Sequence, residues 1–193
     1  MPLMENTLND LAFGVENASG CNERPVVLRA LRDSAREFCR MSEIWVRKFL
    51  YRVEEGITTY DAAGAEDAFV HRVISVRLRR NRQEKCGQET EYELLDGNTI
   101  RIDRELLKNQ KYLEIESVLL PNPGSVNLPE EIVVRNRDAL VYGACARLMR
   151  QAGKPWFSME MAEYYQQKFF GEIQRAIADS RYEHETESTG FSG

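Results

Sequence analysis

The sequence is poor in histidine and lacks the residue spacings of common catalytic and metal sites. His71 falls between valines in a segment of strand-like composition, and His184 falls in a polar tail. Nucleophilic catalysis usually relies on a histidine base, and no HExxH, GxSxG or GxxxxGK[ST] motif is present. No group of Cys, His, Asp and Glu has the ligand spacing of a zinc or calcium site. We therefore expect no enzymatic activity, no catalytic residue, no bound metal and no cofactor.

Long apolar runs and paired cysteines are also missing. No segment approaches the roughly 18 consecutive apolar residues that a membrane helix needs, and the first ten residues do not resemble a secretion signal. The cysteines lie far apart, at Cys21, Cys39, Cys86 and Cys145. We expect free thiols in a reducing compartment. Cys39 and Cys145 fall on the apolar faces of expected helices, where cysteine acts as a small hydrophobic residue.

An excess of positive charge is missing too. The 193 residues include 26 Lys and Arg against 31 Asp and Glu, which gives a formal net charge of -5. Proteins that coat nucleic acid usually show a basic excess, so this balance argues against that role. It is compatible with a protein that lets DNA pass without holding it. Hydrophobic residues make up 42%, enough for one folded domain or one domain with an elaboration.

The remaining pattern predicts an α+β protein, mainly a helical bundle with a small antiparallel β module inserted in it. Residues 1–24 contain few large apolar side chains and predict a flexible arm, or a short helix plus a loop. Pro25 suits a first helical turn, and apolar residues then recur every three or four positions up to about residue 42. This predicts the amino-terminal helix of a helical domain made of residues 25–44 and 125–180.

From residue 45 to 124 the hydrophobic period shifts toward two, which predicts the β module. Asp96-Gly97 is a strong hairpin signal, and Pro121-Asn122-Pro123-Gly124 ends the last strand. Strands are expected in the segments 45–53, 57–60, 69–78, 92–102 and 112–118.

A helical hairpin should follow, with one helix over 129–152 and a second from about Ser158 to 180. Small residues in the first helix would let another helix approach closely: Ala139, Gly143 and Ala144. The expected turn contains Lys154, Pro155 and Trp156. We expect Trp45, Trp156 and Phe157 to be core anchors, although loop tryptophans can also lie in interfaces. Residues 181–193 have no periodicity and should form an extended or disordered tail.

Charge is unevenly distributed in the β module. Six basic residues and one acid lie between Arg72 and Lys85, and five acids and one arginine lie between Glu89 and Asp103. The basic segment could contact nucleic acid or an acidic partner, or its charges could pair across neighbouring strands. It could also meet the acidic segment of an identical subunit. The candidate contact residues are Arg77, Arg79, Arg80 and Arg82.

Five sequence blocks together resemble a known family. They are LRALRDSAREFCRMSEIW, ITTYD, DALVYGACARLM, GKPW and EMAEYYQQKFF. This combination resembles the head-to-tail adaptor proteins of tailed bacteriophages, also called connector or head-completion proteins. The matching blocks span about 28–46 and 128–178. The more specific ones run from Arg36 to Trp45 and from Gly143 to Trp156, and neither is a catalytic motif.

The resemblance implies a structural virion protein that assembles into a ring, commonly a dodecamer, beneath the portal protein. Such a ring extends the DNA channel, through which DNA passes without specific binding, and carries the tail or nozzle protein. No membrane is involved. The protein would lie in the virion neck, and in the host cytoplasm during assembly. In the family the carboxy-terminal segment extends along portal subunits, so the candidate docking residues are Arg181, Tyr182 and Phe191. The alternatives are a tail-completion or nozzle-associated protein, and a DNA-binding accessory protein that uses the Arg77–Lys85 segment.

Overall fold

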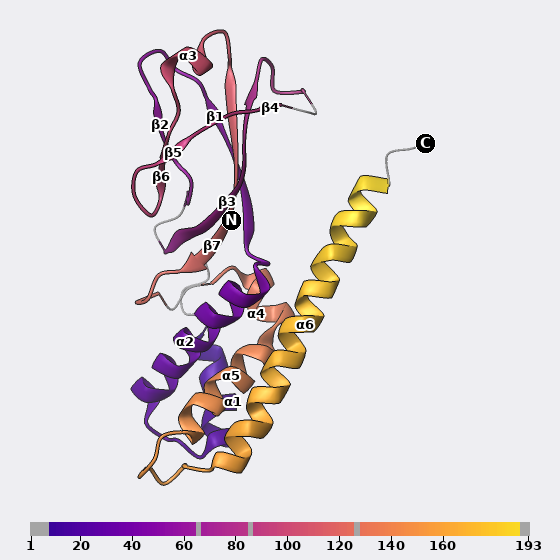
Figure 1. Cartoon of the computed structure of the whole chain (residues 1–193). Helices are drawn as coiled ribbons and strands as arrows, with labels where there is room; N and C mark the ends of the chain where they lie inside the picture. Colours follow the sequence, from indigo (N-terminus) through magenta and orange to yellow (C-terminus); the bar gives the residue numbers. More distant parts are fainter. Residues whose placement is uncertain (1–7, 65–66, 85–86, 126–127, 190–193) are drawn as a thin grey trace. The chain divides into compact units, whose positions relative to one another are not determined.

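The computed structural model describes residues 8–64, 67–84, 87–125 and 128–189, with side chains described up to Arg181. The expected α+β class is confirmed: helices at both ends of the chain flank antiparallel strands (Figure 1). The chain forms two compact units. The helical unit contains the residues up to Ile44 and from Pro121 onward, and the β unit contains Trp45–Leu120.

The helical unit is built around helix α5 (Arg137–Met149), which packs against α1 (Asn9–Ser19), α2 (Arg24–Ser42) and α6 (Met159–Thr189). For residues 1–24 the sequence left open a flexible arm or a short helix plus a loop, and helix α1 corrects the first alternative in favour of the second over the described residues. Its side chains at Leu11, Ala12 and Val15 are fully buried. The three- and four-residue spacing of these apolar positions is the helical signal in a segment otherwise rich in polar residues.

Gly143 lies where three helices meet. A Cβ atom placed there would lie 2.1 Å from Ser34 Oγ on α2 and 2.9 Å from the Phe169 ring on α6. The Ser34 hydroxyl donates a hydrogen bond to the Leu140 carbonyl at 2.9 Å, so this polar group is satisfied inside the core. The Phe169 ring also lies 6.5 Å from the ring of Phe38. Close helix approach at this small residue is therefore confirmed.

Two helix boundaries differ from the prediction. The helix expected over 129–152 is two helices, α4 (Glu130–Arg135) and α5, because Asn136 has φ -121° and ψ 26°. The Asn136 side-chain amide donates to the Ile132 carbonyl at 3.0 Å and so takes part in ending α4. Helix α6 continues to Thr189 instead of ending near 180, so the expected disordered tail is helical over 181–189.

The β unit, which was expected as one small antiparallel module, contains two separate sheets. The first has the order β1-β7-β3-β4, formed by β1 (Val46–Arg52), β7 (Tyr112–Pro121), β3 (Ala68–Arg79) and β4 (Gln88–Glu89). Strands β1 and β7 are antiparallel, with Val46 opposite Val118. The Leu119 amide donates to the Trp45 carbonyl at 2.8 Å. The two ends of the β unit therefore lie side by side.

The second sheet has the order β2-β6-β5, formed by β2 (Thr59–Asp61), β6 (Thr99–Arg101) and β5 (Glu93–Leu94). The Asp96-Gly97 turn joins β5 to β6, as predicted. The Asp96 carboxylate accepts the backbone N–H groups of Asn98 and Thr99 at 2.8 and 2.7 Å, and these hydrogen bonds lower its pKa. The short helix α3 (Arg104–Leu107) follows the sheet.

Candidate partner-binding surfaces

The first candidate surface is formed by the end of β3 and the turn that follows it, residues 77–84, which we call the basic tip. Its arginines do not share one environment. The Arg79 guanidinium lies 2.5 Å from the Glu114 carboxylate on β7, and both side chains are more than four-fifths buried. Arg77 lies 3.8 Å from Glu89 on β4. The charges of Arg77 and Arg79 are therefore paired with acids on neighbouring strands.

Arg80 and Arg82 follow the residues of β3 that pair with β4. Both are exposed, and neither side chain has an ion-pair partner among the described residues. The Glu84 carboxylate accepts the Arg80 backbone N–H at 2.8 Å, which closes the turn. Lys85, the last basic residue of the segment, lies outside the described residues. Of the four arginines proposed as contacts, Arg80 and Arg82 are the two that a partner could reach fully.

The second candidate surface is a hollow of about 700 Å³ beside β5, β6 and α3, which we call the acidic hollow. Two of its carboxylates are already paired within the subunit. Glu93 forms an ion pair with Arg101, and Glu105 forms one with Lys108 at 2.5 Å. Glu91 is exposed, and it has no ion-pair partner among the described residues. The charged side chains of the lining are Glu91, Glu93, Asp103, Glu105, Arg101 and Arg104.

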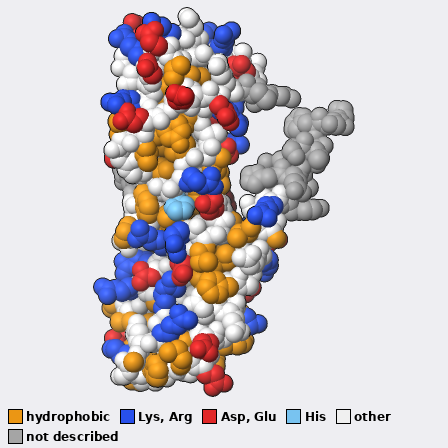
Figure 2. All heavy atoms as spheres, viewed as in Figure 1, with side chains coloured by type: hydrophobic (Ala, Val, Ile, Leu, Met, Phe, Trp, Pro, Cys, Tyr) orange, Lys and Arg blue, Asp and Glu red, His pale blue; other side chains and the backbone are white. Residues whose placement is uncertain are grey.

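Large apolar side chains accompany these acids. Tyr92 and Leu106 line the acidic hollow and are each 42% exposed. Leu94 and Leu95, next along the chain, are 53% and 44% exposed. Hydrophobic side chains gather between charged ones on the face of the β unit seen in Figure 2. Sequence reasoning identified the acidic segment from Glu89 to Asp103 as a possible contact with an identical subunit, but it did not find the exposed apolar side chains, because it assigned the residues after Glu91 to a strand.

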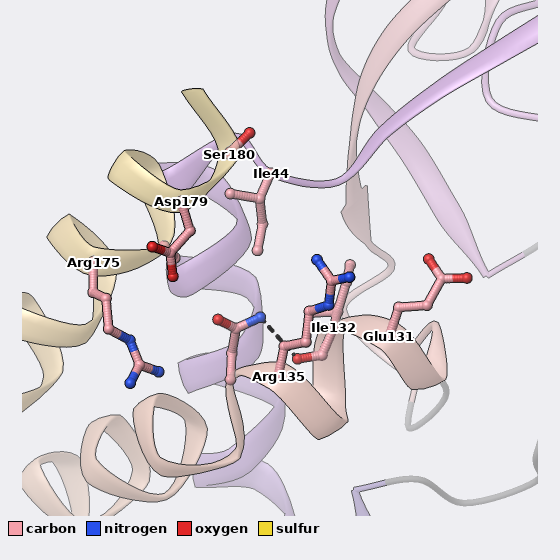
Figure 3. Close-up of a pocket in the computed structure, with 9 residues that line it drawn as sticks. Ile44, Glu131, Ile132, Arg135, Arg175, Asp179 and Ser180 are labelled. Atoms are coloured by element: carbon pink, nitrogen blue, oxygen red, sulfur yellow. Dashed lines mark hydrogen bonds between the residues drawn. The ribbon is translucent and has the colours of Figure 1, made fainter. Parts of the chain in front are cut away.

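A third surface is a pocket of about 710 Å³ between α4 and α6 in the helical unit (Figure 3). Apolar side chains of Ile44, Ile132 and Ala176 contribute to its lining. Arg175 and Asp179 extend into it from α6. Its charged lining side chains carry both signs, at Glu131, Arg135, Arg175 and Asp179. Arg175 also lies 2.7 Å from Glu172 on its own helix. The mixed charge favours a polypeptide partner over a small ion of one sign.

Helix α6 continues to Thr189. Of the α6 side chains that the structure describes, the last buried one is Ala176. We call the following segment, Ile177–Thr189, the α6 extension. Arg181 is exposed on it, Tyr182 lies on its helical backbone, and Phe191 lies outside the described residues.

The expected turn residues lie between α5 and α6. Trp156 is 8% exposed, and its indole N–H donates to the Gln151 side chain at 3.3 Å. The Lys154 ammonium lies 5.2 Å from the Trp156 ring centroid and 3.6 Å from Glu23. Trp45 is also buried, so two of the three predicted core anchors are confirmed. Phe157 is 44% exposed, so its assignment to the core was wrong.

One histidine and two thiols among the described residues have different environments. His71 is exposed on β3. Burial raises the pKa of the Cys39 and Cys145 thiols to about 12, so both stay protonated at neutral pH. Within the described ranges, no three His, Cys, Asp and Glu side chains form a group able to hold a metal ion. Over the same ranges no helix has the length and apolarity needed to cross a membrane.

The sequence was compared with models of known protein families and with curated proteins, and neither comparison gave a match.

Proposed function

We propose that this chain is a structural virion protein that forms a ring adaptor between the portal and the tail of a tailed bacteriophage. The observation that carries the proposal is the α6 extension, which continues past Ala176, the last buried side chain among those that the structure describes on α6. It is about 20 Å long at 1.5 Å per residue. Three of the five sequence blocks that resemble the adaptor family lie on α2, α5 and α6 of the helical unit, GKPW lies in the turn between α5 and α6, and ITTYD lies in the β unit.

A helical segment that projects from the core has little stability of its own. An isolated helix shorter than about 12–15 residues is marginal in water, because few hydrogen bonds offset the cost of nucleation. Helix α6 begins on a packed core, so its extension starts from a nucleated end. A partner that contacts the extension would stabilise its last turns. A portal subunit is the partner that the family resemblance implies, and Arg181, Tyr182 and Phe191 are the proposed contacts.

The test is deletion of residues 181–193 from the full chain. We expect binding to isolated portal complexes to be lost in a pull-down, while the unfolding transition followed by circular dichroism stays unchanged because no described core residue is removed. A chain with Glu160→Gln, at an exposed position near the start of α6, keeps the α6 extension and serves as the matched control. Undiminished portal binding by the truncated chain would contradict the docking proposal. Binding to isolated tails instead of portals would support the tail-completion or nozzle-associated alternative.

The exposure of Arg80 and Arg82 favours one second candidate, a DNA-binding accessory protein. This function requires affinity for duplex DNA that falls steeply with salt concentration, because phosphate contacts release counterions. Binding should then be lost on Arg80→Ala and Arg82→Ala. The absence of measurable binding at low salt would exclude this candidate.

A further inference from the structure

The three-stranded sheet of the β unit has an edge that nothing described covers. Strand β5 is the last strand in the order β2-β6-β5, and within the described part of the chain only β6 pairs with it. Around this edge Tyr92, Leu94, Leu95 and Leu106 are each between 42% and 53% exposed. Exposed apolar groups beside an open strand edge are typical of contact surfaces.

The charge next to this edge indicates what kind of surface would cover it. Four carboxylates and two arginines line the acidic hollow, so its own charge is negative. Glu91 is exposed beside Tyr92, and Asp103 caps α3 by accepting the Glu105 backbone N–H at 2.8 Å. A suitable occupant therefore carries cationic groups on long, partly apolar stems. Arginine fits this description, because its guanidinium can pair with carboxylates and stack on an aromatic ring.

The chain itself presents such arginines elsewhere on the β unit. Arg80 and Arg82 project from the turn between β3 and β4, and that turn belongs to the other sheet. In Figure 1 β4 lies on one flank of the β unit, and the sheet of β2, β6 and β5 lies on the opposite flank. The basic tip and the acidic hollow are therefore placed to meet between two copies of the chain.

We propose that the basic tip of one copy docks in the acidic hollow of the next, with Arg80 and Arg82 against Glu91 and the Tyr92 ring. The proposal deepens the adaptor function, on which it rests, by naming the surfaces that join neighbouring subunits. Two different patches on one subunit form a head-to-tail contact, which closes into a ring if the rotation permits. Each copy then contributes one tip and one hollow.

The contact should be weak in isolation. Exposed ion pairs contribute little to affinity and are screened by salt. On a portal that holds many copies, the local concentration of subunits is high, and the same contact then forms in most of them. Chemical cross-linking suits this situation, because it captures contacts that are formed only part of the time.

The test uses two full-length chains, each with Cys86→Ser so that no native thiol remains in the tip segment. One chain carries Arg82→Cys and the other carries Glu91→Cys. A short bis-maleimide should join them into a heterodimer, with a yield that falls at high salt. A chain with Glu160→Cys, an exposed acid on α6, replaces the Glu91→Cys chain as the matched control and should give only background yield.

Charge reversal then tests the pairing itself. Adding Arg80→Glu to the Arg82→Cys chain should reduce the heterodimer yield about tenfold. Adding Glu105→Lys to the Glu91→Cys chain should restore it, because Glu105 lines the same hollow and its replacement removes a carboxylate that repels the acid introduced at position 80. A yield equal to that of the Glu160→Cys control, insensitivity to Arg80→Glu, or failure of the rescue would each overturn the proposal. If the yield is at background while Arg80→Glu abolishes binding to duplex DNA, the tip is a nucleic-acid contact instead.

This result can be separated from that of the portal experiment. Cross-linking needs no portal, and all the substitutions lie outside the α6 extension. Specific cross-linking together with unchanged portal binding after deletion of 181–193 would contradict only the docking proposal. Background cross-linking together with lost portal binding would contradict only the subunit contact.

Discussion

At the scale of single residues, the packing of the helices depends on where glycines lie. Gly143 is the clearest case, because Ser34 and Phe169 occupy the space that a Cβ atom would need. Gly171, on the exposed side of α6, has no atom within 4 Å of the corresponding position. Two glycines in neighbouring helices therefore differ in what they contribute to stability.

Gly143→Ala should lower the free energy of unfolding by about 1–3 kcal/mol, because the added methyl group forces apart packed helices. Gly171→Ala is the matched control, and it should raise the free energy of unfolding by about 0.5–1 kcal/mol through helix propensity alone. Urea denaturation followed by circular dichroism measures both. Equal effects of the two substitutions would show that Gly143 is not a close-contact point.

The Cys39 thiol predicts a dependence of stability on alkaline pH. Burial raises its pKa from 9.0 to about 12, so between these values the unfolded chain loses a proton that the folded chain keeps. The free energy of unfolding should therefore fall as pH rises through this window, by about 1.4 kcal/mol per pH unit. Below the unfolded pKa this contribution should not change with pH.

Cys39→Ala removes this group and should make the alkaline slope shallower than that of the native sequence, while Cys145, whose thiol pKa burial raises in the same way, keeps its own contribution. Urea denaturation at a series of pH values measures the slope directly. If both chains lose stability with the same slope, the thiol is not the titrating group.

The arginines of the basic tip show what sequence reasoning could and could not establish about the candidate surfaces. The run of positive charge was visible, and so was the possibility of cross-strand pairing. Which arginines are used internally depends on strand order, because Arg79 pairs with Glu114, a residue 35 positions away. The exposed apolar side chains of the acidic hollow were missed for a related reason. Tyr92 and Leu94 have the composition of a strand, but that composition does not show that they lie at the edge of a sheet.

At the scale of elements, α6 has a different environment on each side. Phe169 is fully buried against Phe38, whereas its neighbour Phe170 is 42% exposed. The buried residues after it are Ile173 and Ala176, at helical spacing, and after them the described side chains leave the core. The helix therefore combines a packed anchor with a projecting end.

Phe169→Ala should lower the free energy of unfolding by about 3–5 kcal/mol, because it removes a large side chain from the meeting point of three helices. Phe170→Ala, one position later, should change it by less than about 0.5 kcal/mol. Thermal and urea unfolding of the two chains provide the comparison. A large loss for Phe170→Ala would mean that the exposed face of α6 contacts another copy of the chain.

Elements with strong periodicity or clear turn signals were predicted well. The amphipathic pattern from Pro25 predicted α2, and Asp96-Gly97 predicted the β5–β6 turn. Boundaries set by single side chains were not predicted. Asn136 ends α4 inside a continuous apolar pattern, and two-residue strands such as β4 are too short to have a period.

At the scale of the whole molecule, the β unit is an insertion with adjacent ends. Because Val46 and Val118 are partners in one ladder, their Cα atoms are about 5 Å apart. A short Gly-Ser linker in place of residues 45–120 should therefore leave the helical unit folded, with its helical circular dichroism and a cooperative unfolding transition. The excised segment 45–120, produced alone, is the companion sample. A shortened chain that unfolds without cooperativity would contradict the independence of the two units.

The same adjacency has a consequence for how the chain folds as it leaves the ribosome. The β unit is continuous in sequence, so it can be complete once residue 120 has emerged, whereas α1 and α2 must wait for α5 and α6. Until then α1 and α2 have only each other as helical partners, which leaves much of their apolar faces exposed to aggregation and to chaperones. Pairing of β1 with β7 closes the long loop between α2 and α4 in advance. The later helices therefore reach their partners at a smaller entropic cost.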